Sequence, residues 1–329
     1  MLKSFEQLER RVGCGPSRRV VAVAAGDDLR TLRALDRAER QGILKYRIAG
    51  EREKILRAAE RAGICFSEDR ALYVRSETEA AQGAVFLIKS GKADFLMKGN
   101  LHTAILLKAV LAKENGLRGN GLLSHAALLE VPACRKLLCV TDGGMVPHPT
   151  CEEKAVILQN ALSLFHRLGY GCPKAACLSA SETCSERLPE SLDAVQLTAW
   201  CREGRFGQCI VDGPLSLDLA IHRKACLRKR FHTPTAGDAD ILLVPDVTSG
   251  NLLSKALVTG GAKMAGCVLG AKIPIALSSR AASSYEKYYS LLLACAAAEG
   301  VKGGSQGGFV RHFSGEPRIN NDKVCGLPQ

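Results

Sequence analysis

Aromatic residues are scarce in this sequence, where they make up 5% of 329 residues and include a single Trp. The hydrophobic fraction is nevertheless 47%, and Ala, Leu, Val and Gly are abundant. This composition favours an α/β protein over a β-sandwich. The length allows a full buried core and two domains of ordinary size.

The sequence also lacks an uninterrupted apolar run of transmembrane length, because Lys263 and Lys272 break its most apolar region. Residues 1–13 carry charges throughout and contain no apolar segment of the kind found in signal peptides. We therefore expect a cytoplasmic protein that does not bind membranes.

Closely paired cysteines are missing as well. The 14 cysteines are spread along the whole sequence, and none of them forms a CxxC pair. We expect reduced, mostly buried thiols and no zinc site or other metal site.

Acidic residues are in the minority, since 33 Asp and Glu face 45 Lys and Arg, for a formal charge of +12. Such a balance is compatible with a solvated basic surface, with nucleic-acid binding or with highly anionic small substrates. The densest basic cluster, residues 222–230, has no interleaved aromatic residues, which favours the surface interpretation there. We expect it at the end of one surface helix over residues 215–230.

Strands alternate with helices along the chain, with strand–helix units expected at residues 18–43, 44–64, 71–91 and 93–117. Alternation of this kind indicates βαβ crossovers and a mostly parallel sheet. Asp27 or Asp28 is placed to cap the first of these helices. Only three residues separate the strands expected at 122–132 and 136–144, so these strands should be antiparallel neighbours. The tail after Arg311 shows no periodicity, and we expect it to be mobile or an oligomer contact.

Residues 246–287 hold the strongest functional signal, because strand exits and helix starts that can bind anions flank Arg280 there. In open α/β sheets, ligands bind outside the carboxyl ends of the strands. The residues expected at those ends are rich in Ser, Gly and Asn, which suit phosphate better than a divalent metal. They are Lys98-Gly99-Asn100, Ser124-His125, Asp142-Gly143-Gly144, Ser179, Asp212-Gly213-Pro214, Asp246 with Ser249-Gly250-Asn251, and Ser278-Ser279-Arg280.

Several long segments of the sequence resemble the phosphate acetyl/butyryltransferase family, and its phosphate butyryltransferase branch above all. They occur in the family's order within residues 1–300, and they are LMKGNLHTAILLKAVL, LLSHAALLEVP, IVDGPLSLDLAI, ADILLVPDVTSGNLLSKAL and AGCVLGAKIPIALSSRA. The resemblance implies a two-domain, three-layer α/β/α fold of the isocitrate/isopropylmalate dehydrogenase type with an active-site cleft between the domains. We expect residues 1–132 plus 280–329 to form the first domain and residues 133–279 the second.

The resemblance implies the reaction of an acyl-CoA, butyryl-CoA in the first instance, with phosphate to give acyl phosphate and CoA by direct attack in a ternary complex. It implies no cofactor or metal, with coenzyme A as substrate or product. It also implies a homodimer or higher homo-oligomer that functions together with an acyl kinase. The alternatives are a phosphate acetyltransferase, a non-catalytic relative that binds CoA or acyl phosphate, and a nucleic-acid-binding protein.

By the same resemblance, Ser279 and Arg280 are the catalytic pair that binds phosphate, although Arg280 has a salt bridge as its structural alternative. The family commonly has Asp six residues after this Arg, where the present sequence has Glu286. That carboxylate is a candidate base for the CoA thiol. It also fits a capping box with Ser283, and the two roles are compatible. Ala282 departs from the Asp or Cys that relatives often have.

Eight further residues are expected to bind substrate. Ser124 resembles a phosphate-site serine of the family, and Lys108 stands where relatives often have Arg. The structural alternatives are helix capping for Thr103 and an ordinary structural role for His125. The eight residues are Asn100, His102, Thr103, Lys108, Ser124, His125, Ser249 and Asn251.

Overall fold

We analysed a computed structural model that describes residues 1–13, 19–119 and 122–298. One sheet of eleven strands runs through this part of the chain in the order β3-β2-β1-β4-β11-β10-β5-β6-β9-β7-β8. The strands are β1 (Arg19–Ala24), β2 (Leu44–Gly50), β3 (Ala71–Tyr73), β4 (Phe95–Lys98), β5 (Ser124–Glu130), β6 (Leu138–Thr141), β7 (Lys174–Leu178), β8 (Ile210–Leu215), β9 (Ile241–Leu243), β10 (Lys263–Leu269) and β11 (Ile275–Ala276).

Helices follow most of the strands in the chain, as the alternation in the sequence predicts. They are α1 (Phe5–Gly13), α2 (Leu29–Arg40), α3 (Arg52–Ala62), α4 (Glu77–Lys89), α5 (Thr103–Leu111), α6 (Cys151–Arg167), α7 (Pro189–Arg202), α8 (Leu217–Ile221), α9 (Arg223–Lys229), α10 (Val247–Thr259) and α11 (Ser284–Ala298), with the short 3₁₀ turns η1 (Glu68–Arg70) and η2 (Lys113–Asn115). Asp28 caps α2 by accepting hydrogen bonds from two backbone N–H groups of its first turn, which confirms one of the two predicted caps.

The sheet is mostly parallel, and its antiparallel pairs lie together in the middle. There β5 pairs with β6 and β10, and β10 pairs with β11, all antiparallel. The predicted antiparallel pairing of β5 and β6 is therefore confirmed, since three residues cannot form a crossover. On its other edge β11 is parallel to β4, with Ile275 opposite Leu96 and Ala276 opposite Met97. This pairing brings residues 277–280 beside the end of β4.

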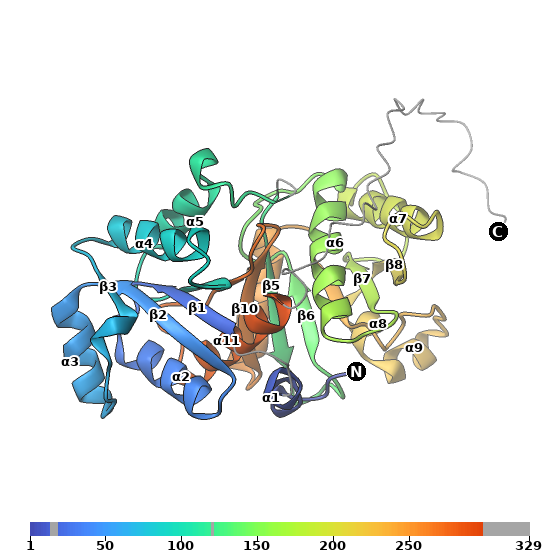
Figure 1. The fold of residues 1–329 in the computed structure, drawn as a ribbon. Coiled ribbons are helices and arrows are strands. Elements are labelled where there is room, and N and C mark those ends of the chain that lie inside the picture. Colours follow the sequence, from blue (N-terminus) through green and yellow to red (C-terminus); the bar gives the residue numbers. More distant parts are fainter. Residues whose placement is uncertain (14–18, 120–121, 299–329) are drawn as a thin grey trace. The chain divides into compact units, whose positions relative to one another are not determined.

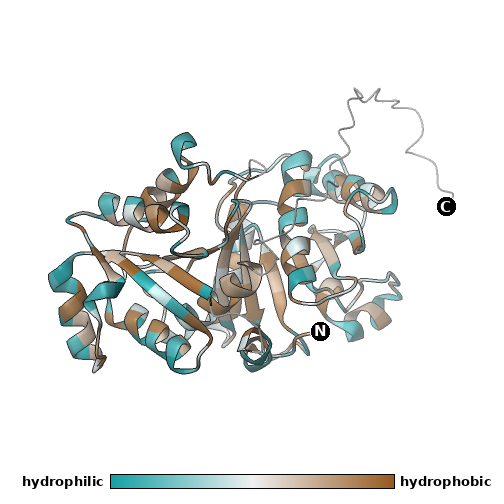
Figure 2. Ribbon diagram, viewed as in Figure 1, coloured by the Kyte–Doolittle hydropathy of each residue, from teal (hydrophilic) through white to brown (hydrophobic). Residues whose placement is uncertain are grey.

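Side-chain alternation along the strands divides the core into two sides of the sheet. In β1, Val21 and Val23 pack in a cluster with α1, α2, α3, α6 and α11, whereas Ala22 and Ala24 pack in a cluster with α4 and α5. Figure 1 shows α2 and α3 on the side of the sheet opposite to α4 and α5. In Figure 2 the strands are largely apolar, while polar residues gather on the helices around them. The predicted mixed α/β fold is confirmed.

Two predicted helices differ from those in the structure. The basic segment 215–230 is not one helix, because His222 has the extended angles φ −116 and ψ 99 and separates α8 from α9. The backbone N–H of Gly237 donates to the carbonyl of Leu219 at 2.7 Å, so the surrounding chain holds α8 in place. Helix α5 ends at Leu111, earlier than its apolar pattern predicts.

The predicted division into residues 1–132 plus 280–329 and 133–279 stays a prediction, and the tail after Arg311 lies outside the described residues. Across residues 1–13, 19–119 and 122–298, none of the helices has the length and apolar character required to cross a membrane.

Candidate functional site

The carboxyl ends of β1, β4 and β11 meet at one edge of the sheet. At this edge Gly99 follows β4, and a Cβ built on it would lie 2.1 Å from the carbonyl oxygen of Ala25. Any side chain is therefore excluded at position 99. The N–H of Asn100 donates to the same carbonyl at 2.7 Å, which fixes the backbone and leaves the Asn100 side chain exposed.

The predicted catalytic pair lies in the loop after β11. Ser279 and Arg280 are both exposed, and the Ser279 hydroxyl accepts a hydrogen bond from the N–H of Ala281 at 3.2 Å. Arg30 of α2 donates to the carbonyl of Ala281 at 3.1 Å and so ties this loop to the first strand–helix unit. The guanidinium of Arg280 forms no hydrogen bond or ion pair with any residue that the structure describes, so its donors face solvent or a ligand.

Glu286 forms the capping box that its spacing from Ser283 predicts. One carboxylate oxygen accepts from the N–H of Ser283 at 2.7 Å and from its hydroxyl at 3.0 Å. The Ser283 hydroxyl in turn accepts from the N–H of Glu286 at 3.2 Å. The other carboxylate oxygen makes none of these bonds. Capping is thus observed, and the role of Glu286 as a base stays a prediction.

His102 pairs with a carboxylate of the neighbouring helix α4. Its backbone N–H and its Nδ1 lie 3.1 Å and 3.0 Å from the same carboxylate oxygen of Glu77. These bonds lower the pKa of Glu77, with a smaller contribution from the charge of Arg280. Thr103 is the first residue of α5, and Lys108 lies exposed in its last turn.

Ser124 and His125 begin β5, in the middle of the sheet. Ser124 is buried, and its hydroxyl accepts from the side-chain amide of Asn160 at 3.0 Å. Burial lowers the pKa of His125, and the nearby Asp142 opposes this shift. The imidazole is therefore neutral at pH 7.

Asp142 organises the loop beside His125. This buried carboxylate accepts hydrogen bonds from the N–H groups of His125 at 3.0 Å, Gly144 at 2.9 Å, Met145 at 3.1 Å and Val146 at 2.9 Å. Three of these donors belong to the loop and one to β5, so Asp142 ties the loop to the strand.

Ser249 and Asn251 lie in the first turns of α10. Ser249 forms a capping box with Asp246, whose side chain accepts from the Ser249 N–H at 2.8 Å. The Asn251 amide donates to the carbonyl of Gly143 at 3.2 Å, and a Cβ on Gly250 would lie 2.8 Å from the Cα of Gly143. This close contact joins the start of α10 to the loop held by Asp142.

The predicted site residues thus fall into two groups. One group surrounds the ends of β1, β4 and β11, and its members are Asn100, His102, Thr103, Ser279, Arg280 and Glu286. The second group surrounds β5 and the start of α10, and its members are Ser124, His125, Ser249 and Asn251. Lys108 belongs to neither group, because it lies at the far end of α5 from His102.

The chain that carries these two groups is similar to known proteins over most of its length. Residues 74–295 match the family described as phosphate acetyl/butaryl transferase. The chain belongs to this family. It is 38% identical over 282 residues to the probable phosphate butyryltransferase of Bacillus subtilis, an alignment that covers 85% of this chain and 94% of that protein. It is 34% identical over 274 residues to the phosphate acetyltransferase of Thermotoga maritima, covering 83% and 93% of the two chains.

A solved structure agrees with the family assignment. The branched-chain phosphotransacylase of Enterococcus faecalis superimposes with a TM-score of 0.75 at 33% sequence identity, over 85% of this chain and 99% of that one. The recognition made from the sequence is confirmed, and so is the prediction of a transferase of this family.

Two buried lysines of this transferase lie near the first group. The sequence places Lys98 among the strand-end residues without assigning it a role, and it does not single out Lys287. Lys98 ends β4 with 3% of its surface exposed, and Lys287 lies in α11 with 1% exposed. A signal exists for Lys287, because it is the only charged residue of α11 after Glu286. For Lys98 the signal is a cation at the end of a strand that is otherwise apolar.

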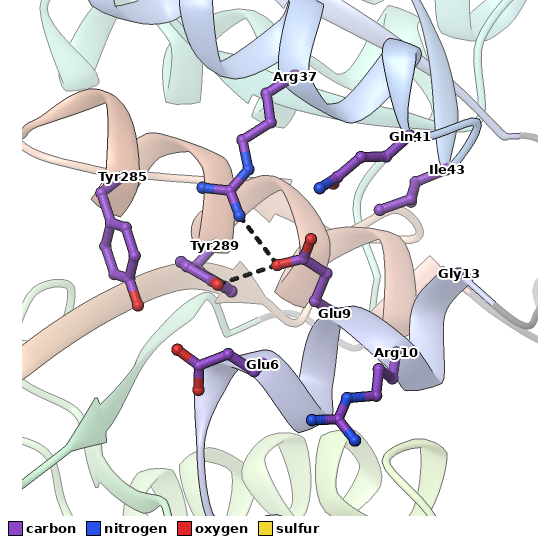
Figure 3. A pocket seen from close by; sticks show the side chains of 9 residues that line it. All are labelled: Glu6, Glu9, Arg10, Gly13, Arg37, Gln41, Ile43, Tyr285 and Tyr289. Carbon is purple, nitrogen blue, oxygen red and sulfur yellow. Dashed lines mark hydrogen bonds and ion pairs between the residues drawn. The ribbon is translucent and has the colours of Figure 1, made fainter.

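The transferase also has a cavity of about 550 Å³ that none of the predicted site residues lines. Glu6, Glu9, Arg10, Gly13, Arg37, Gln41, Ile43, Tyr285 and Tyr289 surround it, from α1, α2, the start of β2 and α11 (Figure 3). Glu9 binds Arg37 at 3.1 Å and accepts from the Tyr289 hydroxyl at 3.0 Å, so these two charges on the wall neutralise each other.

Proposed function

We propose that the protein is a phosphate butyryltransferase that converts an acyl-CoA and inorganic phosphate into acyl phosphate and CoA. The observation that carries the proposal is the unpaired guanidinium of Arg280, beside Ser279, in a chain that is 38% identical to a probable phosphate butyryltransferase over 282 residues. A planar fork of N–H donors binds phosphate oxygens in pairs, and no carboxylate of the described residues is ion-paired with it.

In the proposed reaction an oxygen of phosphate attacks the thioester carbonyl carbon. The C–S bond breaks as the new C–O bond is completed, and CoA leaves as its thiolate. Arg280 and Ser279 hold phosphate in position, and hydrogen-bond donors at the site stabilise the oxyanion that develops on the carbonyl oxygen. In the reverse direction Glu286 accepts the proton of the CoA thiol.

We assign the remaining predicted residues to substrate binding. His102, Thr103 and Asn100 lie on the phosphate side, where backbone N–H groups open helix α5. Ser124 and the neutral His125 contribute from β5, and Ser249 and Asn251 from the start of α10. Lys108 binds CoA if CoA extends along α5. The chemistry needs positioning and charge stabilisation, and a thiolate is a good leaving group without metal assistance.

The acyl group, assembly and location belong to the same proposal. Butyryl is the proposed acyl group, and acetyl is the alternative, because the chain is also 34% identical to a phosphate acetyltransferase. We further propose a cytoplasmic homodimer or higher homo-oligomer. Its product is a reactive phosphoryl donor, so an acyl kinase that uses acyl phosphate is the proposed functional partner.

The test measures release of CoA from acetyl-, butyryl- and hexanoyl-CoA with a thiol-reactive dye. We expect release only when phosphate is present, without added divalent metal, and fastest with butyryl-CoA. Arg280→Ala should lower turnover roughly 10²- to 10³-fold, as the loss of a donor to the reacting group does. Arg33→Ala, an exposed arginine of α2, is the matched control.

Two results would contradict the proposal. If no thioester releases CoA in response to phosphate while CoA still binds, the protein is a binding relative. If Arg280→Ala turns over like Arg33→Ala, Arg280 has no part in the reaction.

A further inference from the structure

Two lysines are buried behind the loop that carries Arg280. Lys98 and Lys287 are 3% and 1% exposed, although an ammonium group loses several kcal/mol of hydration when it is buried without compensation. Lysines are almost never fully buried unless they are paired.

Their pairing inside the protein is incomplete. The Nζ of Lys98 donates to the carbonyl oxygens of Gly99 at 3.3 Å and Leu101 at 3.0 Å, which occupies two of its three donors. The Nζ of Lys287 lies 3.9 Å from a carboxylate oxygen of Asp28, a separation too long for a hydrogen bond. Among the described residues, Lys287 forms no hydrogen bond through its ammonium group.

Pairing between β4 and β11 places a third polar group beside them. Ala276 is opposite Met97 in this parallel pair, so continuing the register brings Ser278 beside Gly99. Ser278 is 7% exposed, and its buried hydroxyl has no hydrogen-bond partner among residues 1–13, 19–119 and 122–298. A buried hydroxyl without a partner costs free energy that a bound ligand would recover.

The charges of Lys287 and Arg280 act on Lys98. Burial, followed by the charges of Lys287 and Arg280, lowers the pKa of Lys98 to about 8. Burial also lowers the pKa of Lys287 against the opposing attraction of Asp28, and the nearby Arg30 adds to the shift. The cations thus repel one another across this region, which an anion between them would relieve.

The acids around these cations are already engaged. Asp28 caps α2 through its N–H groups, Glu77 accepts from His102, and Glu286 accepts from Ser283. Asp27, at the end of the first strand–helix turn, has its pKa raised, chiefly by burial. None of these carboxylates lies within hydrogen-bond distance of either lysine ammonium.

We propose that Lys98, Lys287 and Ser278 form the inner wall of a binding site for a tetrahedral dianion, which Arg280 closes from the solvent side. Under the proposed function on which this inference rests, that dianion is inorganic phosphate or the phosphoryl group of acyl phosphate. The two lysines then act as positioning residues, because their charges orient the phosphate whose oxygen attacks the thioester.

Binding of inorganic phosphate to the full-length protein tests this site separately from turnover. Calorimetry near pH 8, in buffers of different ionisation enthalpy, should show that phosphate binding takes up protons, because the anion raises the pKa of Lys98. Lys98→Met and Lys287→Met should each weaken phosphate binding at least 10-fold, and Lys98→Met should abolish the proton uptake. Lys92→Met, an exposed lysine in the turn before β4, should bind phosphate like the unchanged protein.

Thermal unfolding separates this role from a structural one. Lys287→Met should melt no lower than the unchanged protein in chloride buffer, since it removes a buried charge that forms no hydrogen bond with the described residues. Lys98→Met should melt lower, because it also loses the bonds to the carbonyl oxygens of Gly99 and Leu101. Both variants should lose the rise in melting temperature that phosphate produces. If a Met variant does not fold, Ser278→Ala replaces it and should also weaken phosphate binding.

Unaltered phosphate affinity in Lys98→Met and Lys287→Met, or absence of phosphate binding in the unchanged protein, overturns the inference. Phosphate binding that needs both lysines, in a protein that releases no CoA, supports the anion site and refutes only the proposed reaction.

Discussion

The two roles of Glu286 can be separated with a pair of single substitutions. Glu286→Gln keeps an oxygen that can accept from the Ser283 N–H and hydroxyl, which now lie 2.7 Å and 3.0 Å from the carboxylate. The cap therefore survives, but the amide cannot take a proton. Loss of a general base lowers turnover about 10²- to 10⁴-fold, or roughly 3 to 5 kcal/mol of activation free energy.

Ser283→Ala is the reciprocal change. It removes the hydroxyl that accepts from the Glu286 N–H at 3.2 Å and leaves the carboxylate in place. Loss of a capping side chain costs about 1 kcal/mol of folding free energy, so the melting temperature should fall by a few degrees while turnover is maintained.

Both variants should be assayed for CoA consumption with butyryl phosphate and for thermal unfolding. The base role predicts a large loss of turnover with unchanged melting for Glu286→Gln, and the opposite combination for Ser283→Ala. If Glu286→Gln retains most of its turnover, or loses turnover only in proportion to its stability, then Glu286 is a cap and the base lies elsewhere.

Three further predictions concern stability and thiol chemistry. Asp142→Ala leaves four backbone N–H groups without their acceptor and should cost about 4 kcal/mol in urea unfolding, whereas Asp142→Asn, which keeps one acceptor oxygen, should cost clearly less. Asp27→Asn should raise the melting temperature at pH 7, because burial raises the pKa of Asp27 and ionisation of this carboxyl therefore opposes folding. The gain should disappear as the pH falls below about 4, where the carboxyl is protonated in the folded and in the unfolded protein. A hydrogen bond with Cys209 lowers the pKa of Cys201 to about 7, so iodoacetamide should label the Cys201 peptide at neutral pH, and Cys209→Ala should slow that labelling. An equal labelling rate of Cys201 in the unchanged protein and in Cys209→Ala would contradict the prediction for this thiol. Equal unfolding costs for Asp142→Ala and Asp142→Asn would contradict the prediction for Asp142.

Local patterns in the sequence were sufficient for several of these features. The acid before α2 and the Ser283 to Glu286 spacing predict caps because capping depends on residues only a few positions apart. The three-residue connection between β5 and β6 decides their direction for a similar reason, since its length alone excludes a crossover. The order of segments that resemble the family was specific enough to predict the mixed α/β fold.

Features that depend on distant partners could not be predicted in the same way. His102 meets Glu77 because α4 and α5 pack together, and nothing in either helix indicates the register. His222 interrupts a run of good helix formers, and the contact of Gly237 with Leu219 holds the preceding helix. Lys287 is buried because nearly all sides of α11 are covered by other parts of the protein. The sequence of α11 alone does not show that the side carrying Lys287 is covered.

The pairing of β4 with β11 has a consequence for how the protein is made. Because β11 begins at Ile275, the N-terminal units are synthesised long before the strand that completes them. Until then β4 has an open edge of unpaired N–H and C=O groups, which is the kind of edge that recruits other chains. Closing it requires a contact between residues far apart in sequence, which slows folding. A nascent chain or fragment that stops before residue 275 therefore lacks the strand that protects β4, and we expect it to aggregate.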